Sequence, residues 1–119
     1  MQSFRNLKVW ERAHALTLDI YKSSACFPRE EMYGLTSQMR RSSASIGASI
    51  AEGCCRKGDP EFGRFLQLVM GSASELEYRL PLASDPNLLK SLDHRRLAEK
   101  TDEIKRMLTS LIHKLRADG

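Results

Sequence analysis

The chain has 119 residues, of which 41% are hydrophobic, 29% charged and 7% aromatic. This length excludes several ordinary domains and the balanced composition excludes wholesale disorder, so we expect one domain, residues 1–119, that folds without disulfide or metal. Nineteen Lys and Arg side chains oppose fifteen Asp and Glu, and the resulting charge of +4 is small for a protein dedicated to nucleic acid.

The excess positive charge lies in the first half of the chain. Residues 1–57 contain nine basic and five acidic side chains, whereas residues 58–119 contain ten of each. An anionic partner is therefore expected to meet the first half. The candidate phosphate-binding residues are Arg5, Lys8, Arg12, Arg40, Arg41, Arg56 and Lys57.

Export and membrane insertion are not expected. Charged side chains interrupt the first eleven residues, which excludes a signal peptide, and no apolar run approaches the roughly 20 residues that span a bilayer. The three cysteines, Cys26, Cys54 and Cys55, are odd in number, and the adjacent pair closes only a strained ring. We therefore predict a cytoplasmic protein with reduced thiols.

The first helix is predicted from about Leu7 to Phe27, with Asn6 as its N-cap. One helical stripe is apolar and is expected in the core; it consists of Val9, Ala13, Leu16, Ile20 and Phe27. A second stripe is aromatic and half polar, and is expected at the edge of the core or against a partner; it consists of Leu7, Trp10, His14, Thr17 and Tyr21.

Pro28 ends the first helix because it lacks an N–H group and disfavours helical geometry at the residue before it. The second helix is predicted from Leu35 to Arg56. A third begins after Gly58, with Asp59 as N-cap and Pro60 at the first helical position, and reaches about residue 83.

A fourth helix is predicted from near His94, after a possible Asp93 cap, to Arg116. In both the third and the fourth helix, the residues of the core stripe recur in steps of four and three. The stripe of the fourth helix ends with Leu111 and Leu115. No segment alternates with period two, so no strand is expected. Four helices of about 20 residues with short links predict an all-α, up-down-up-down four-helix bundle.

The second helix is unusual because both of its faces are apolar or small. Nine of the twelve residues from Ser42 to Gly53 are Ser, Ala or Gly. The face opposite Ile46 lacks the long polar side chains of a solvent-exposed helix, so we expect a second copy of the chain to cover it. The candidate oligomer interface comprises Ala44, Gly47, Ala48 and Ala51, with Trp10 and Tyr21 of the first helix.

Three carboxylates are expected to have structural roles: Glu52, Glu75 and Glu77. Glu52 lies within the small-residue segment, where a buried carboxylate needs a cationic partner. Arg56, four residues later, is the local candidate, and Arg40 or Arg41 of a neighbouring chain is the alternative.

No constellation of catalytic or metal-ligating residues emerges. A di-metal bundle needs Glu-x-x-His on two helices, and Glu11 with His14 is the one instance here. Phosphate-binding glycine loops and nucleophile elbows are also missing from the sequence. We therefore expect no cofactor, no metal and no enzymatic activity, which leaves binding.

Three segments resemble a known bacterial family, the 23S rRNA intervening-sequence proteins. They are FRNLKVWERA (residues 4–13), FPREEMYGLTSQMRRSSASIGASIAEG (residues 27–53) and GSASELE (residues 71–77). The resemblance runs from about Phe4 to Leu115. It implies a small cytoplasmic four-helix bundle that assembles as a homopentamer, and a fold similar to the accessory protein of diversity-generating retroelements, which binds nucleic acid and a reverse transcriptase.

The resemblance also marks signature positions, none of which is a known catalytic residue: Gln38, Arg40, Arg41, Ile46, Glu52, Gly53, Gly71, Ser72, Glu75 and Glu77. Two departures from the family pattern lie in the second helix: Ser49 replaces the usual Asn, and Cys54-Cys55 replaces a polar pair.

Two functions remain open at this point. The first is a non-enzymatic oligomeric bundle that binds RNA or DNA through the basic residues of the first half. The second is an adaptor that docks a partner enzyme along the Trp10 and Tyr21 flank and does not bind nucleic acid. A bundle enzyme with a metal or cofactor is the disfavoured third class.

Overall fold

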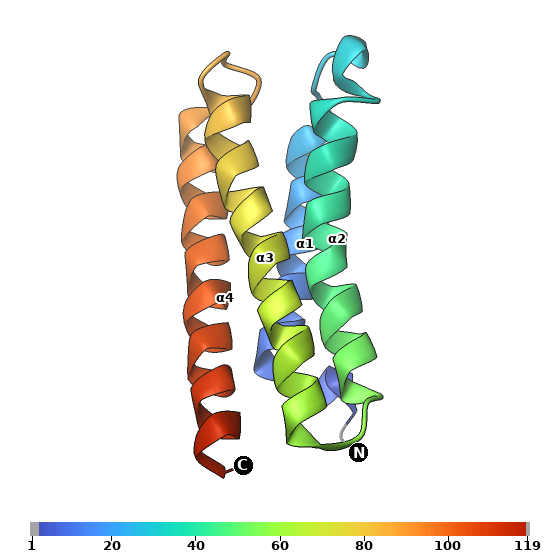
Figure 1. The fold of residues 1–119 in the computed structure, drawn as a ribbon. Coiled ribbons are helices and arrows are strands. Elements are labelled where there is room, and N and C mark those ends of the chain that lie inside the picture. The colour runs from blue at the N-terminus through green and yellow to red at the C-terminus, as the bar shows by residue number, and fades with distance from the viewer. Residues whose placement is uncertain (1–2, 119) are drawn as a thin grey trace.

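The computed structural model describes residues 3–118, with side chains described for residues 3–116 (Figure 1). Its α-helices are α1 (Lys8–Ser24), α2 (Leu35–Cys54), α3 (Gly58–Ser84) and α4 (Ser91–Asp118), and its two short 3-10 helices are η1 (Phe4–Asn6) and η2 (Arg29–Glu31). No strand occurs within residues 3–118. The predicted all-α class with four helices is therefore confirmed.

Contacts between α1 and α4 fix their relative direction. Arg12 of α1 pairs with Glu103 of α4, whereas Asp19, further along α1, pairs with Arg96, which comes earlier in α4. The two helices therefore run antiparallel. Figure 1 shows η1, the α2–α3 link and the end of α4 at one end of the molecule, called the lower end here. The two other links lie at the upper end of a bundle that measures 46 by 22 by 20 Å.

One core lies between the four helices and buries the predicted apolar stripes. Its largest fully buried side chains are Leu16, Ile20, Met39, Ile46, Ile50, Leu66, Val69, Leu76, Leu80, Leu97, Ile104 and Leu108. The stripe on α4 departs from the strict repeat after Leu108, since Ile112 is buried while Leu111 and Leu115 are half-buried. A straight helix has 3.6 residues per turn, so a four-three repeat drifts away from the core over several turns.

The helix starts differ from the sequence predictions. Asn6 does not cap α1: it lies in η1, and Leu7 precedes α1 without a side-chain cap. Asp59 does not cap α3 either, because the helix already begins at Gly58, whose φ of +80° suits glycine. Asp93 lies inside α4, where its carboxylate accepts a hydrogen bond from Arg96 at 2.7 Å.

The ends of α1 and α2 were also predicted too late, whereas α3 and α4 end one and two residues after the predicted positions, at Ser84 and Asp118. α1 stops at Ser24, whose hydroxyl donates to the carbonyl of Ile20 at 2.7 Å, and Phe27 enters the core from the link instead. α2 stops at Cys54, two residues before Arg56.

Glycine positions give a direct test of the packing. A Cβ atom at Gly53 would lie 2.9 Å from Cβ of Phe65 and 3.0 Å from Cδ1 of Phe62, whereas a Cβ at Gly63 would have nothing within 4 Å. Gly53→Ala should lower the free energy of unfolding by about 1–3 kcal/mol through overpacking. Gly63→Ala, the control, should raise it by up to about 1 kcal/mol through helix propensity. Urea unfolding measures both, and a stabilised Gly53→Ala variant would contradict this close packing of α2 on α3.

Candidate functional site

The candidate basic residues fall into two groups at opposite ends of α2. Arg40 and Arg41 lie in the second turn of α2, near the upper end (Figure 1). Lys57 lies at the lower end, where it immediately precedes α3, and η1 with its Arg5 packs against α2. Thirteen residues of helix separate Arg41 from the end of α2 at Cys54, a distance of about 20 Å at 1.5 Å per residue.

Two of the candidate arginines form ion pairs within the chain. Arg12 donates from one nitrogen to both carboxylate oxygens of Glu103, at 3.0 and 3.1 Å. Arg56 donates to Glu52 at 2.9 Å, and its guanidinium lies 4.8 Å from the ring centroid of Phe65. The predicted local partner of Glu52 is therefore present, but Glu52 is exposed rather than buried.

Arg40 has a structural role at the end of α1. Its Nε donates to the hydroxyl of Ser24 at 2.9 Å, and Nη2 donates to the carbonyl of Tyr21 at 3.3 Å. The guanidinium also lies 4.7 Å from the centroid of the Tyr21 ring. Arg40 thus satisfies a carbonyl in the last turn of α1, so fewer of its donors are free for a ligand.

The other four candidates are exposed and form no ion pair with a carboxylate in the part of the chain whose side chains are described: Arg5, Lys8, Arg41 and Lys57. The contrast between the two halves is general. Within residues 3–116, two of the nine basic side chains up to residue 57 form ion pairs, against six of the ten beyond it. Two of the five acidic side chains of the first half, Asp19 and Glu52, are paired as well, so ion pairing preserves the charge difference that the sequence shows.

A polar hollow of about 350 Å³ lies between α2 and α3 and contains Arg41. Its lining is Gln38, Arg41, Ser42, Ser45, Ser72, Glu75 and Arg79, four of which are positions marked by the family resemblance. The hydroxyls of Ser45 and Ser72 lie 2.7 Å apart across the two helices. Arg79 was missed by the sequence analysis, although its position four residues after Glu75 indicates an ion pair, which forms at 2.9 Å.

The remaining predicted carboxylate, Glu77, accepts a hydrogen bond from Lys105 of α4 at 2.9 Å. Each of the three carboxylates, Glu52, Glu75 and Glu77, thus has one cationic partner in the chain. The partner of Glu75, Arg79, lies on the same helix. The partner of Glu52, Arg56, lies just beyond the end of α2, and the partner of Glu77, Lys105, lies on α4.

The small-residue face of α2 is covered in part by the chain itself. A Cβ on Gly47 would lie 3.4 Å from Nε1 of Trp10, so Trp10 of α1 occupies the space that Gly47 leaves. Ala44 and Ala48 are exposed and Ala51 is half-buried. The outer alanines of α2 thus face solvent in the single chain, and their burial by a second copy of the chain stays a prediction.

Trp10 belongs to an aromatic cluster at the lower end. Its ring stacks on His14 with centroids 5.0 Å apart and meets the ring of Phe4 edge-on at 4.9 Å. Tyr21 lies about three turns further along α1. Its side chain is partly exposed to solvent, and the guanidinium of Arg40 lies over its ring. The two aromatic residues predicted as one interface therefore have different surroundings.

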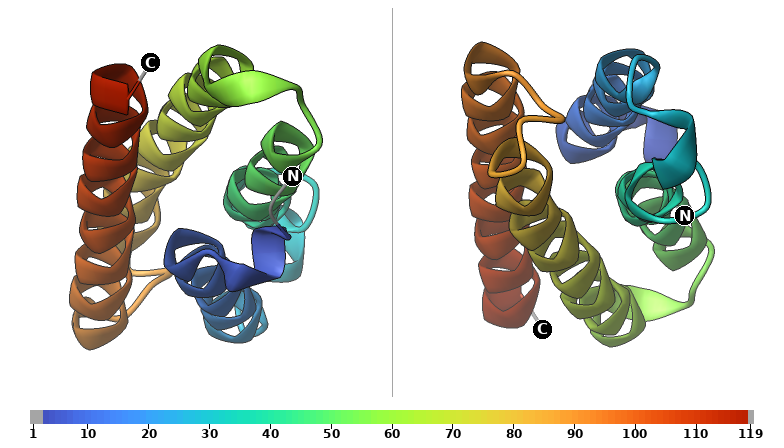
Figure 2. Two further views of the ribbon diagram at one scale, coloured as in Figure 1. Left: turned by 90° about the horizontal axis from the view of Figure 1, so that it is seen from below. Right: turned by 90° about the horizontal axis from the view of Figure 1, so that it is seen from above.

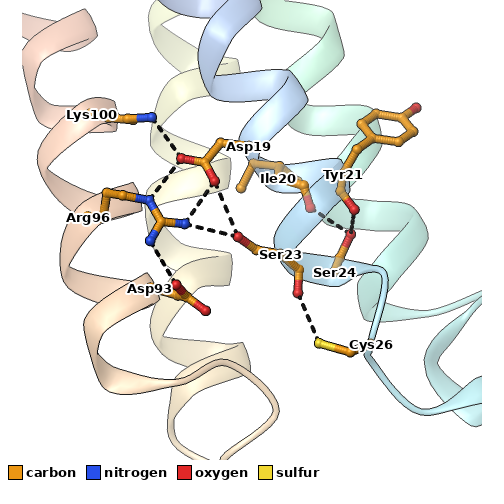
Figure 3. Close-up of polar contacts among 9 residues, drawn as sticks. All are labelled: Asp19, Ile20, Tyr21, Ser23, Ser24, Cys26, Asp93, Arg96 and Lys100. Atoms are coloured by element: carbon orange, nitrogen blue, oxygen red, sulfur yellow. Dashed lines mark hydrogen bonds and ion pairs between the residues drawn. The ribbon is translucent and has the colours of Figure 1, made fainter.

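The upper half of the α1–α4 contact contains a charge network (Figure 3). Asp19, with a side chain only 12% exposed, accepts hydrogen bonds from Arg96 at 2.8 and 3.0 Å and from Lys100 at 2.7 Å. Arg96 also contacts Asp93 at 2.7 Å and Ser23 at 3.2 Å. The network borders a hollow of about 630 Å³ between α1 and the α3–α4 link.

This network stabilises the fold and does not fit acid–base catalysis. The hydrogen bonds from Arg96, helped by Lys100, hold the pKa of Asp19 far below the usual carboxyl range in spite of its partial burial. A general acid or base needs a pKa near the working pH, which Asp19 lacks. Cys26 borders the same hollow, but its thiol has one contact, the carbonyl of Ser23 at 3.6 Å.

Other chemistry is not indicated by the described residues. Burial and the neighbouring Cys55 raise the pKa of the Cys54 thiol, which disfavours the nucleophilic thiolate. No group of three His, Cys, Asp or Glu side chains in residues 3–116 is arranged to hold a metal ion. None of the described helices is both long and apolar enough to cross a bilayer.

The fold and these surfaces define a small, all-helical four-helix protein with charged and small-residue faces. Residues 5–110 match the family described as 23S rRNA-intervening sequence protein. The match covers most of the chain, so the protein belongs to that family, and the resemblance of the three segments is confirmed.

A solved structure has a similar fold. It is described as a protein with unknown function from the S23 ribosomal protein family of Bacteroides thetaiotaomicron. The TM-score is 0.78 at 24% sequence identity, over 87% of this chain and 97% of that chain. At this identity the likeness supports the fold alone. No curated protein matches the chain.

Asp19 gives a prediction about stability and pH. Its pKa is lower in the folded chain than in the unfolded chain, so its contribution to stability is complete above about pH 5 and is lost as the pH falls. Asp19→Asn should lower the free energy of unfolding at pH 7 by about 1–3 kcal/mol and flatten its decline between about pH 5 and 2. Urea unfolding across this pH range measures both effects.

Glu99→Gln serves as the control for Asp19→Asn, because Glu99 is an exposed carboxylate on α4 that forms no ion pair within residues 3–116. The free energy of unfolding of the Glu99→Gln variant should equal that of the wild type at every pH. Equal effects of the two substitutions would contradict the role given to the network.

Proposed function

We propose that this protein is a non-enzymatic, cytoplasmic homo-oligomer of up-down-up-down four-helix bundles that binds RNA or DNA phosphates through the basic residues of its first half. The observation that supports this most is the set of exposed cations without ion-pair partners in residues 3–116: Arg5, Lys8, Arg41 and Lys57. Their charge is not neutralised by a described carboxylate, so it is available to a polyanion.

Assembly increases the strength of this surface. A single chain carries a net charge of +4, and a symmetric oligomer repeats that charge in every copy. The hollow that contains Arg41 adds polar groups from α2 and α3 beside the cation. A phosphate group there meets the guanidinium of Arg41 and several hydroxyls, which suits recognition of a backbone rather than of a base.

The exposed alanines of α2 support self-association. Ala44 and Ala48 face solvent in the single chain, and Gly71 of α3 is exposed, with open space where a Cβ atom would lie. An exposed interior glycine weakens a helix by about 1 kcal/mol, a cost that close approach of another copy offsets. The family resemblance favours a pentamer. The cysteines form no disulfide, which fits a reducing cytoplasm.

An adaptor without nucleic-acid binding is the second candidate. Leu18 and Tyr21 of α1 are large apolar side chains that are 57% and 46% exposed. Such residues fit the edge of a protein–protein contact, and Trp10, near the start of the same helix, would extend that contact. In this case the protein would dock a partner enzyme along α1.

Nucleic-acid binding is tested by fluorescence anisotropy with a structured RNA and a DNA duplex at two salt concentrations. Binding should weaken steeply with salt. Arg41→Glu or Lys57→Glu should each weaken it about tenfold near 0.1 M salt, which is what one phosphate contact contributes through counterion release. Arg95→Glu, at an exposed α4 cation without an ion pair in residues 3–116, is the matched control and should have a smaller effect.

Absence of binding to either nucleic acid at about 50 mM salt would remove the first function and leave the adaptor. Equal losses for all three charge reversals would show that net charge, rather than the surface named here, determines binding.

Self-association is tested by light scattering at tens of micromolar. The wild type should have a mass several times that of the 13.5 kDa chain, and five times that mass for a pentamer. Ala48→Glu should reduce the mass because it places a charge in the close contact, whereas Ala15→Glu, at an exposed alanine of α1, should not. A monomeric wild type would contradict the proposed assembly.

A further inference from the structure

A groove at the lower end of the bundle arises because α1 is shorter than α4. The ion pair between Arg12 and Glu103 sets the register, which places Lys8, the first residue of α1, opposite Met107. α4 continues from there for eleven residues to Asp118, about 16 Å or three turns. η1 packs against α1 and α2 and has no contact with α4 among the described residues.

The last turns of α4 therefore lack the neighbour that α1 provides higher up. Figure 2 shows, in the view from below, that α3 leans towards α2 at this end and away from the end of α4. The space left beside α1 and α4 is a hollow of about 490 Å³. Its floor is apolar and consists of Leu7, Val9, Met107 and Leu111.

The rim of this groove is cationic. Lys8, Arg106 and Lys114 line it, and all three are exposed. Glu103 is the one carboxylate of the lining, and both of its oxygens are occupied by Arg12. Arg106 has a single weak partner among the described residues, Asp102 at 3.5 Å. The groove thus combines an uncovered apolar floor with a positive edge.

We propose that this groove binds an acidic amphipathic helix of a partner protein. The groove continues the line of α1 along α4 from Met107 to Lys114, about two turns, so a helix fits it as a further bundle member. Apolar residues at i, i+3, i+4 and i+7 cover the floor, while acidic residues beside them meet the three cations. The inference does not depend on nucleic-acid binding.

Charge complementarity and the apolar floor select this occupant over two others. A second copy of the chain is net basic and so complements a cationic rim poorly, and its proposed contact is the alanine face of α2, which does not line this groove. A nucleic-acid backbone has the right charge but leaves the floor of Leu7, Met107 and Leu111 without an apolar partner.

The test uses a capped, fluorescein-labelled peptide of about four helical turns, with leucines at i, i+3, i+4 and i+7 of each repeat and glutamates at the flanking positions. A matched peptide has lysine at every glutamate position. Fluorescence anisotropy should give a dissociation constant on the order of 10 µM for the acidic peptide and no saturable binding for the basic one. Amide chemical shifts should change at residues 7–9 and 103–114.

The double charge reversal Arg106→Glu with Lys114→Glu should weaken binding of the acidic peptide at least about tenfold. The pair Lys90→Glu with Arg95→Glu makes the same change in net charge away from the groove and should leave the affinity within about twofold. All four residues are exposed, so folding should survive in both variants.

Failure of the acidic peptide to bind, equal binding of the basic peptide, or equal losses for the two double variants would each overturn the proposal. Shifts of the groove amides that depend on protein concentration without peptide would show that a second copy covers the groove, and would overturn it too.

The anisotropy assay with RNA, run on the same variants, separates this inference from the proposed function. The variant Arg106→Glu with Lys114→Glu should lose no more RNA affinity than the control Lys90→Glu with Arg95→Glu. The variant Lys57→Glu should bind RNA more weakly but bind the acidic peptide as the wild type does.

Discussion

Close contact between α2 and the helices on either side of it organises the bundle. On one side Trp10 of α1 fills the space above Gly47, and on the other Phe62 and Phe65 of α3 close over Gly53. A Cβ atom at Gly53 would come too close to Phe62 and Phe65, whereas one at Gly47 would just reach contact distance from Trp10, so Gly53 is the tighter of the two positions. The small residues of α2 therefore set the distances at which α1 and α3 pack.

Ion pairs cross the contact between α1 and α4, and they affect the charge of the surface. Asp19 is held by Arg96 and Lys100, so cations of α4 are used to neutralise an acid of α1. The first half thereby loses one of its few carboxylates to a helix of the second half. Arg41 and Lys57 are among the first-half cations that form no ion pair in the described chain, whereas Arg12 and Arg56 do form one. Arg12 of the first half pairs in turn with Glu103 of α4, so the ion pairs between these two helices leave the positive excess of the first half unchanged.

The sequence predicted the helices and the core because these depend on local periodicity. Leu16, Leu76 and Ile104 are buried where the four-three spacing places them. It failed at the caps: Asn6 and Asp59 are good capping residues, but packing of η1 and the positive φ of Gly58 decide where α1 and α3 begin. Local propensity is a weak guide where tertiary contacts fix the end of a helix.

The sites were predicted less well because they depend on residues far apart in the chain. The partners of Asp19 lie 77 and 81 residues away, and no spacing rule connects them. The polar hollow needs Ser45 and Ser72 on facing helices. The groove arises from a difference in helix length, which becomes visible when the register of α1 against α4 is known. Arg56 with Glu52 was predictable because the two lie four residues apart in the sequence, although Arg56 falls just beyond the end of α2.

The rigidity of α2 also limits how one chain can lie on a nucleic acid. Arg41 and the lower end of α2 are held about 20 Å apart along a straight helix. On a B-form duplex with 3.4 Å per base pair this span corresponds to roughly six base pairs, little more than half a turn. Over this span one strand passes to the far side of the duplex, so in the proposed function the two cationic ends of one chain cannot both follow the same strand along one face of a straight duplex.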